Sequence, residues 1–116
     1  MVKEITRDEL KEKLNHPKKS VLLEILAPKE YRQAHLPGAL NMPPGQVRIL
    51  APELIPNTDF EVIVYCAGPT CHASDQAAHE LVALGYTKVR HYSGGKGDWI
   101  EADLPVVRAE RQQRAA

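Results

Sequence analysis

Two short, nearly uninterrupted apolar runs constrain the fold of this chain more than any other feature of its sequence. Residues 21–26 are apolar except for Glu24, and residues 62–65 are apolar throughout. Continuous runs of this length are typical of strands that are buried on both faces of a parallel sheet. A third strand pattern at residues 89–92 follows a helical pattern, so strands and helices alternate along the chain. This order predicts a parallel α/β sheet.

The segments between these runs have the patterns of helices. Thr6 and Glu9 have the capping-box spacing, which predicts a helix that Pro17 ends. An apolar stripe predicts another helix over residues 74–84, with Gly85 as its C-terminal stop. The other expected elements are a short strand at residues 39–42 and helical segments at residues 28–35, at residues 47–55 and around Trp99.

The length and composition fit one globular domain. The chain has 116 residues, of which 43% are hydrophobic and 26% charged, as in folded soluble proteins. Its 15 basic and 15 acidic residues balance, so nothing predicts a nucleic-acid surface. No apolar stretch is long enough to span a membrane, and no signal-peptide pattern is visible. We expect one domain over residues 1–108, a frayed tail over residues 109–116 and a cytoplasmic location.

The most informative segment joins the strand at residues 62–65 to the helix that follows. Cys66 directly follows this strand, and ligands of α/β sheets bind beyond the carboxyl ends of the strands. Loop amides and the positive end of a helix lower the pKa of a thiol and stabilise thiolate or persulfide. We therefore predict that Cys66 is a nucleophile and sulfur carrier; the alternative is an inert buried cysteine. The expected active-site loop contains Ala67, Gly68, Pro69, Thr70 and His72.

Cys71 allows two interpretations. It is either a small residue that fills the first turn of the helix or a second thiol with a redox role. A curled loop can bring its Cα atom within about 7 Å of that of Cys66, the range that a disulfide requires. We expect no metal site, because the chain has only two cysteines and no CxxC pair. The other histidines are scattered along the chain, at His16, His35, His79 and His91.

Three segments of the chain resemble the rhodanese family. Residues 23–43 resemble its amino-terminal signature; they read LEILAPKEYRQAHLPGALNMP. This signature is an apolar strand with an acid, followed by a Pro-Glu-(Tyr/Phe) helix start and a His-(Ile/Leu)-Pro-Gly-Ala turn. Residues 62–66 resemble its catalytic strand and nucleophile. The closing pattern of the family is matched by Leu84-Gly85-Tyr86, Val89, Gly94-Gly95 and Trp99. The agreement spans residues 4–106, so the chain resembles a single-domain rhodanese, which is a sulfurtransferase.

The resemblance implies a single rhodanese-like domain with a five-stranded, mostly parallel sheet flanked by helices. It implies that Cys66 takes sulfane sulfur from thiosulfate, polysulfide or a low-molecular-weight persulfide. The resulting Cys66 persulfide would pass its sulfur to a thiol or cyanide, with a protein acceptor also open. We expect no cofactor, and the balanced charge and short apolar stretches predict no nucleic-acid and no membrane partner. Glu24 takes the place of the family's buried strand acid, which has a structural role.

The chain lacks arginines at two positions where the family commonly has them. The rhodanese loop commonly ends in an arginine where this chain has Cys71, and Ile25 and Leu26 stand where an arginine often follows the strand acid. Anionic donors therefore lack the expected side-chain cation, and a phosphatase function is disfavoured for the same reason. Two alternatives to a plain sulfurtransferase stay open. One is a redox or polysulfide-handling protein in which Cys71 resolves the Cys66 persulfide, and the other is a non-catalytic interaction domain.

Overall fold

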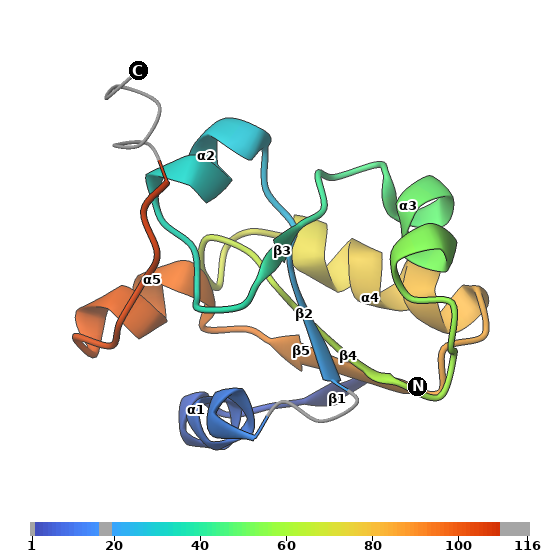
Figure 1. Ribbon diagram of the computed structural model, residues 1–116, viewed down its shortest axis with the longest axis horizontal. Helices are drawn as coiled ribbons and strands as arrows, with labels where there is room; N and C mark the ends of the chain where they lie inside the picture. Colours follow the sequence, from blue (N-terminus) through green and yellow to red (C-terminus); the bar gives the residue numbers. More distant parts are fainter. Residues whose placement is uncertain (1, 17–19, 110–116) are drawn as a thin grey trace.

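Five parallel strands form the sheet at the centre of the molecule (Figure 1). The computed structural model describes residues 2–16 and 20–109. The strands are β1 (Val2–Glu4), β2 (Ser20–Glu24), β3 (Leu40–Asn41), β4 (Glu61–Tyr65) and β5 (Lys88–Tyr92). Their spatial order is β1-β5-β4-β2-β3, and every neighbouring pair runs parallel. The predicted parallel α/β sheet is confirmed, with β4 as its central strand.

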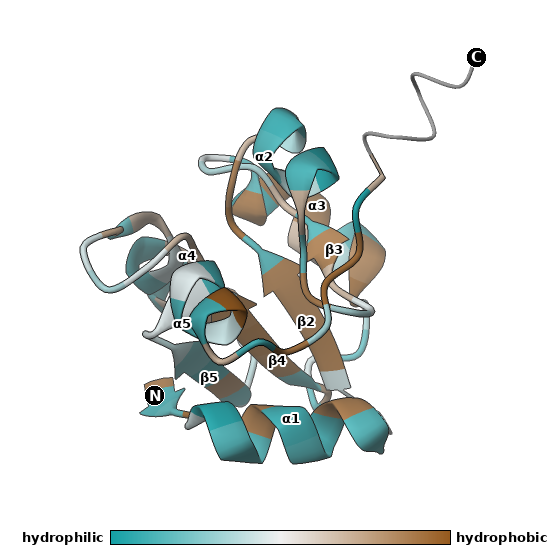
Figure 2. Cartoon of the chain, turned by 90° about the vertical axis from the view of Figure 1, so that its left-hand side faces the viewer, coloured by the Kyte–Doolittle hydropathy of each residue, from teal (hydrophilic) through white to brown (hydrophobic). Residues whose placement is uncertain are grey.

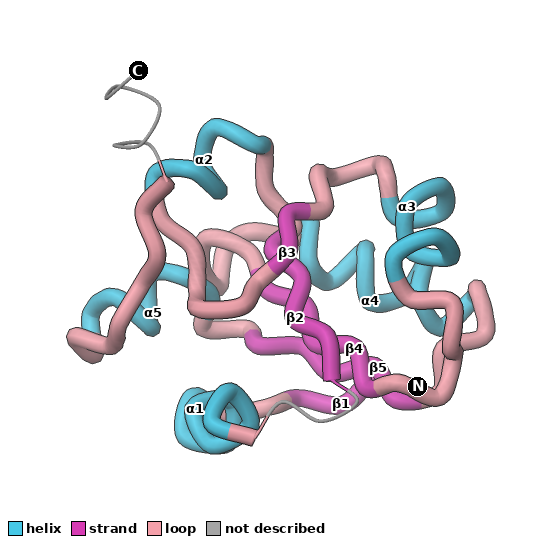
Figure 3. The backbone as a smooth tube through the Cα atoms, in the orientation of Figure 1, coloured by secondary structure: helices cyan, strands magenta, loops and turns pink. Residues whose placement is uncertain are grey.

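Helices cover both faces of the sheet (Figure 3). They are α1 (Arg7–Asn15), α2 (Pro28–Gln33), α3 (Val47–Leu54), α4 (Ala73–Ala83) and α5 (Gly95–Glu101). Val62 and Val64 of β4 pack with residues of α3 and α4, whereas Ile63 and Tyr65 pack with residues of α1 and α5. Because β4 is buried on both faces, its apolar run is uninterrupted. Figure 2 shows β2 and β4 as hydrophobic strands.

The chain enters α1 as its sequence predicts. The side chain of Thr6 accepts a hydrogen bond from the N–H of Glu9 at 3.1 Å, and the Glu9 carboxylate accepts one from the N–H of Thr6 at 2.9 Å. The bond from the Thr6 N–H holds the pKa of the Glu9 carboxyl below its usual value. Ile5 and Leu10 on either side of the cap are buried, as a hydrophobic staple requires. Pro17, the predicted end of the helix, lies outside the described residues.

The described chain stays hydrogen-bonded to the domain up to its last residue. His35 and Val107 exchange two backbone hydrogen bonds, at 2.9 and 2.8 Å. The N–H of Ala109 donates to the carbonyl oxygen of Arg32 at 3.0 Å. Ala109, at which we expected the frayed tail to begin, is therefore held, and the rest of that expected tail, residues 110–116, lies outside the described residues.

Candidate active site

Cys66 lies at the carboxyl end of the central strand, directly after Tyr65. Its side chain is buried, with 1% of the residue exposed. The loop that follows covers it and leads into α4. In this loop the structure leaves Gly68 partly exposed and four further residues exposed: Ala67, Pro69, Thr70 and His72. The predicted site residues thus come together at one edge of the sheet, with Cys66 at the base of an exposed loop.

The carbonyl oxygens of this loop are held by the turn that begins α5. The N–H of Lys96 donates to the oxygen of Cys66, and the N–H of Gly97 donates to the oxygen of Ala67, both at 2.8 Å. The N–H of Cys71 closes the loop on the oxygen of Gly68 at 3.1 Å. In a trans peptide the C=O and N–H groups point in opposite directions. The amides of Ala67 and Gly68 therefore point away from α5, toward the other side of the loop.

The loop and the first turn of α4 have N–H groups available for an anion. Those of Ala67, Gly68, Thr70, His72 and Ala73 donate to no acceptor within residues 2–16 and 20–109. His72 occupies the N-cap position of α4 and makes no side-chain cap. The dipole of the helix adds positive potential at the same end. This edge of the sheet can therefore stabilise negative charge on sulfur with backbone groups alone.

Gly95 allows the close approach between this loop and α5. Its φ is +70°, in the left-handed region that favours glycine. A Cβ atom at Gly95 would lie 2.7 Å from the carbonyl oxygen of Cys66 and 2.8 Å from the nitrogen of Gly68. A Cβ at Gly97 would lie 3.2 Å from the oxygen of Ala67. Gly95, a glycine of the closing pattern, and Gly97 thus lie directly against the loop that follows Cys66, a contact that the sequence alone does not reveal.

We predict that Gly95→Ala displaces the loop and destabilises the fold by about 2–4 kcal/mol, combining left-handed strain with a backbone clash. Gly45→Ala is the matched control, because Gly45 has a φ of +84° but a Cβ atom there would have nothing within 4 Å. The control should cost only the strain, about 1 kcal/mol. Urea unfolding of both variants measures the difference. Equal losses in the two variants would show that the contact with the loop has no energetic weight.

Cys66 and Cys71 are joined by a disulfide. Their Cα atoms lie 6.2 Å apart, so the expectation that the loop curls to within disulfide range is confirmed. Cys71 is partly exposed and precedes the first residue of α4 by two positions. The bond therefore closes without any loss of helix.

Beneath the loop, Glu24 is fully buried and is held by a cation and a phenol. Lys96 Nζ lies 3.0 Å from its Oε2, and the Tyr65 hydroxyl donates to its Oε1 at 2.6 Å. Burial, with the charge of Glu24, raises the pKa of Tyr65, so the phenol stays a donor. The same ammonium donates to the carbonyl oxygens of Glu30 and Ala34, at 3.0 and 2.6 Å. All three N–H bonds of Lys96 are thus used within the protein.

Comparisons with known proteins agree with this architecture. The family model described as "Rhodanese-like domain" matches residues 6–102. The chain belongs to this family. A protein of Allochromatium vinosum named "Sulfurtransferase" is 34% identical over 110 residues, which cover 95% of this chain and 99% of that protein. The "Thiosulfate sulfurtransferase PspE" of Escherichia coli is 35% identical over 75 residues, which cover 64% of this chain and 69% of the relative.

A solved structure also shares the fold of this rhodanese-like domain. The structure described as "rhodanese with anions from E. coli" superposes with a TM-score of 0.65 at 30% identity, and the match covers 77% of this chain and 98% of that one. The names of these relatives indicate sulfur transfer as the general chemistry of the family members that this chain resembles.

A second polar cluster of the rhodanese-like domain lies at the start of α4 and was not foreseen from the sequence. His91 Nε2 lies 2.9 Å from Ser74 Oγ, and His91 Nδ1 lies 3.3 Å from Glu4 Oε2. Ser74 is only 2% exposed, and its hydroxyl is paired with the His91 ring. The cluster ties β1 and β5 to the first turn of α4 and so fixes the helix behind the loop.

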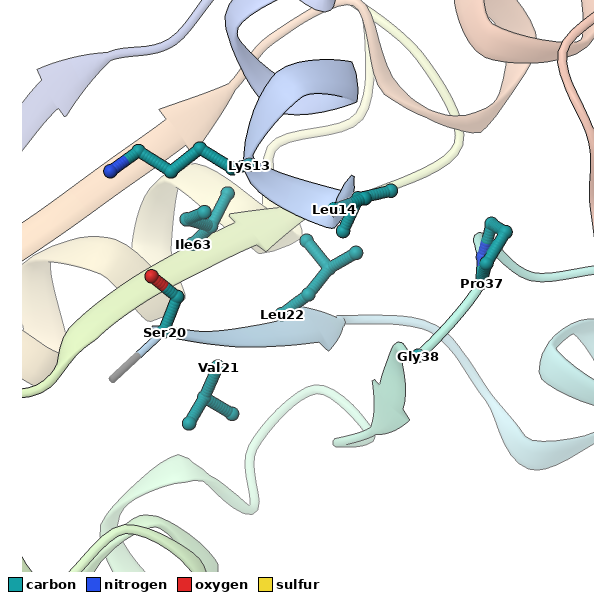
Figure 4. A pocket seen from close by; sticks show the side chains of 8 residues that line it. All are labelled: Lys13, Leu14, Ser20, Val21, Leu22, Pro37, Gly38 and Ile63. Carbon is teal, nitrogen blue, oxygen red and sulfur yellow. The ribbon is translucent and has the colours of Figure 1, made fainter. Parts of the chain in front are cut away.

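A cavity of about 220 Å³ lies elsewhere, under α1 (Figure 4). In Figure 4 the side chains of Leu14, Leu22 and Ile63 point toward the same space. Ser20 lines it at the amino end of β2, whereas Cys66 follows the carboxyl end of the parallel strand β4. The cavity is therefore not part of the cysteine site.

No helix of residues 2–16 and 20–109 is long and apolar enough to cross a bilayer. In the same residues no three His, Cys, Asp or Glu side chains gather as they would around a metal ion.

Proposed function

We propose that this rhodanese-like domain is a sulfurtransferase in which Cys66 carries the sulfur. The observation that carries the proposal is the position of Cys66 at the carboxyl end of the central strand, at the base of a loop whose Ala67, Gly68 and Thr70 N–H groups find no acceptor among the described residues. Such groups favour the thiolate and the persulfide over the neutral thiol. The names of the A. vinosum and E. coli relatives support the same chemistry.

The proposed reaction has two displacements at sulfur. The Cys66 thiolate attacks the sulfane sulfur of a donor; with thiosulfate, the S–S bond breaks and sulfite leaves with the electron pair. The enzyme then holds the sulfur as a Cys66 persulfide. A thiolate or cyanide attacks the terminal sulfur in the second step, which restores the Cys66 thiolate and gives a new persulfide or thiocyanate. Each step exchanges one S–S bond for a new bond to sulfur and needs no cofactor.

The acceptor and the compartment are part of the same proposal. A low-molecular-weight thiol, cyanide or a protein thiol can each supply the attacking nucleophile. A reducing compartment such as the cytoplasm would keep Cys66 available as thiolate. Thiocyanate formation from cyanide and a sulfane donor tests the proposal, because a non-catalytic interaction domain would form none above background.

The donor should be selected by its charge. Residues 66–74 contain no lysine or arginine, and the ammonium of the neighbouring Lys96 is bonded to Glu24 and two carbonyl oxygens. A missing charge-assisted contact costs about 1.5–3 kcal/mol, roughly ten- to hundredfold in rate when the contact acts in the transition state. We therefore expect kcat/KM for thiosulfate to lie below that for a less charged sulfane donor such as cysteine persulfide.

A loop variant separates this effect from the intrinsic reactivity of the donors. Thr70→Arg places a cation in the exposed loop, and Thr70→Gln is its uncharged control of comparable length. The arginine should raise kcat/KM for thiosulfate relative to the persulfide, and the glutamine should not. Wild-type activity clearly higher with thiosulfate, with no gain from the arginine, would contradict the electrostatic argument.

A further inference from the structure

We propose that Cys71 is a resolving thiol that converts the Cys66 persulfide into free sulfide and a Cys66–Cys71 disulfide. This inference rests on the proposed function, because it requires that Cys66 carry sulfur. It adds a second activity to the domain: the reduction of sulfane sulfur to sulfide, with electrons taken from the two cysteines.

The first support is the geometry of the loop. The Cα atoms of Cys66 and Cys71 lie 6.2 Å apart and the two residues form a disulfide. The turn that brings them together is closed by the hydrogen bond from the N–H of Cys71 to the oxygen of Gly68, at 3.1 Å. The carbonyl oxygen of Cys66 accepts a hydrogen bond from the backbone N–H of Lys96 at 2.8 Å. The backbone is thus arranged for the Cys66–Cys71 bond while β4 and α4 stay intact.

The chemistry balances without an external oxidant. The Cys71 thiolate attacks Sγ of Cys66 in the persulfide, and the bond between this Sγ and the terminal sulfur breaks. The terminal sulfur takes the electron pair and leaves as hydrosulfide. The two cysteine sulfurs are oxidised by two electrons in total, and the sulfane sulfur is reduced by two. Attack on the terminal sulfur would instead only move the persulfide to Cys71, without release of sulfide.

The two cysteines differ in exposure, and this difference determines which sulfur of the disulfide a reductant attacks. In the disulfide-bonded structure Cys66 is 1% exposed, whereas Cys71 is partly exposed beside the exposed Thr70 and His72. An incoming thiolate therefore reaches Cys71 and expels Cys66 as the leaving thiolate, the form that the loop N–H groups favour. A dithiol reductant completes the cycle, since its second thiol frees Cys71 from the mixed disulfide. The expected net reaction converts a sulfane donor and a dithiol into sulfide, the donor without its sulfane sulfur, and the oxidised dithiol.

A single-turnover experiment tests the inference. Fully reduced wild type, Cys71→Ser and Cys71→Ala are loaded with excess polysulfide, freed of donor, and incubated without added thiol. Sulfide release is followed together with the intact mass. The wild type should release about one equivalent of sulfide and end two hydrogen atoms lighter than the reduced protein. Both variants should stay one sulfur atom heavier and release sulfide at least about tenfold more slowly.

Peptide mapping locates the bond. No lysine or arginine lies between Arg48 and Lys88, so trypsin leaves both cysteines in one peptide, residues 49–88. After turnover this peptide should be two hydrogen atoms lighter in the wild type, and dithiothreitol should restore its mass. Circular dichroism of the variants excludes unfolding as the cause of a difference.

The outcomes separate this inference from the proposed function. In one outcome the wild type and both variants load one sulfur, release sulfide at the same rate and give no lighter peptide. This result would show that Cys71 only packs in the loop, and Cys66 would remain the carrier. Failure of all three proteins to load sulfur would overturn the proposed function and, with it, the resolving role.

Discussion

Replacing Cys66 with serine should reduce sulfur transfer to the background rate, a loss of roughly a thousandfold or more. A serine hydroxyl is ionised to a negligible extent near neutral pH and cannot carry a sulfane sulfur. The N–H groups of the loop remain in this variant, but they have no thiolate to stabilise. Thiocyanate formation under saturating donor measures the loss, and a urea unfolding curve confirms that the variant is folded.

Cys71→Ser is the matched control for this experiment, because it removes the other thiol of the same loop. It should still load one sulfur, since Cys66 alone follows β4 into the loop. Loading by Cys66→Ser and not by Cys71→Ser would exchange the roles of the two cysteines. Retention of wild-type transfer by Cys66→Ser would remove Cys66 from the mechanism.

Replacing Lys96 with methionine should destabilise the fold by about 3–5 kcal/mol, the cost of leaving a buried charge without its partner. Glu24 is fully buried and Lys96 nearly so, with 0% and 12% of their side chains exposed. The lysine also donates to the carbonyl oxygens of Glu30 and Ala34, so α2 loses a contact with α5. Urea unfolding at neutral pH gives the difference in free energy.

A double variant identifies the buried charge as the cause. Glu24→Gln keeps an acceptor for the Tyr65 hydroxyl at nearly the same volume but carries no charge. In combination with Lys96→Met it should recover part of the stability that Lys96→Met alone loses. If the free energy of unfolding of Lys96→Met lies within about 0.5 kcal/mol of the wild-type value, the ion pair contributes little to stability.

The sheet could be predicted because its signal is local. Residues 62–65 are apolar without interruption since β4 is the central strand and is buried on both faces. The capping box of Thr6 and Glu9 and the helix stop near Gly85 are likewise contained in a few neighbouring residues. The position of Cys66 followed from the same reasoning, because the residue after a buried parallel strand emerges at the ligand edge.

The tertiary contacts that position the site could not be predicted, because they join residues far apart in the chain. A buried Glu24 requires a cation, but the sequence offers 15 lysines and arginines and does not indicate that Lys96 is the partner. The approach of Gly95 to the Cys66 carbonyl depends on how α5 packs against the loop. The bond between Ser74 and His91 joins α4 to β5 in the same way. Contacts of this kind leave no periodic pattern in the sequence.

Intact-mass measurement of the loaded protein shows whether Cys66 carries a transferable sulfur. Reduced protein is exposed to a sulfane donor, freed of the excess and measured before and after addition of cyanide. Because the Cys66 persulfide could be resolved by Cys71, the measurement is made on wild type quenched early and on Cys71→Ser. Both should gain one sulfur atom and lose it to cyanide with formation of thiocyanate, and Cys66→Ser should gain none. If Cys66→Ser still gains a sulfur atom and loses it to cyanide, Cys66 is not the carrier. The same conclusion follows if Cys71→Ser gains no sulfur.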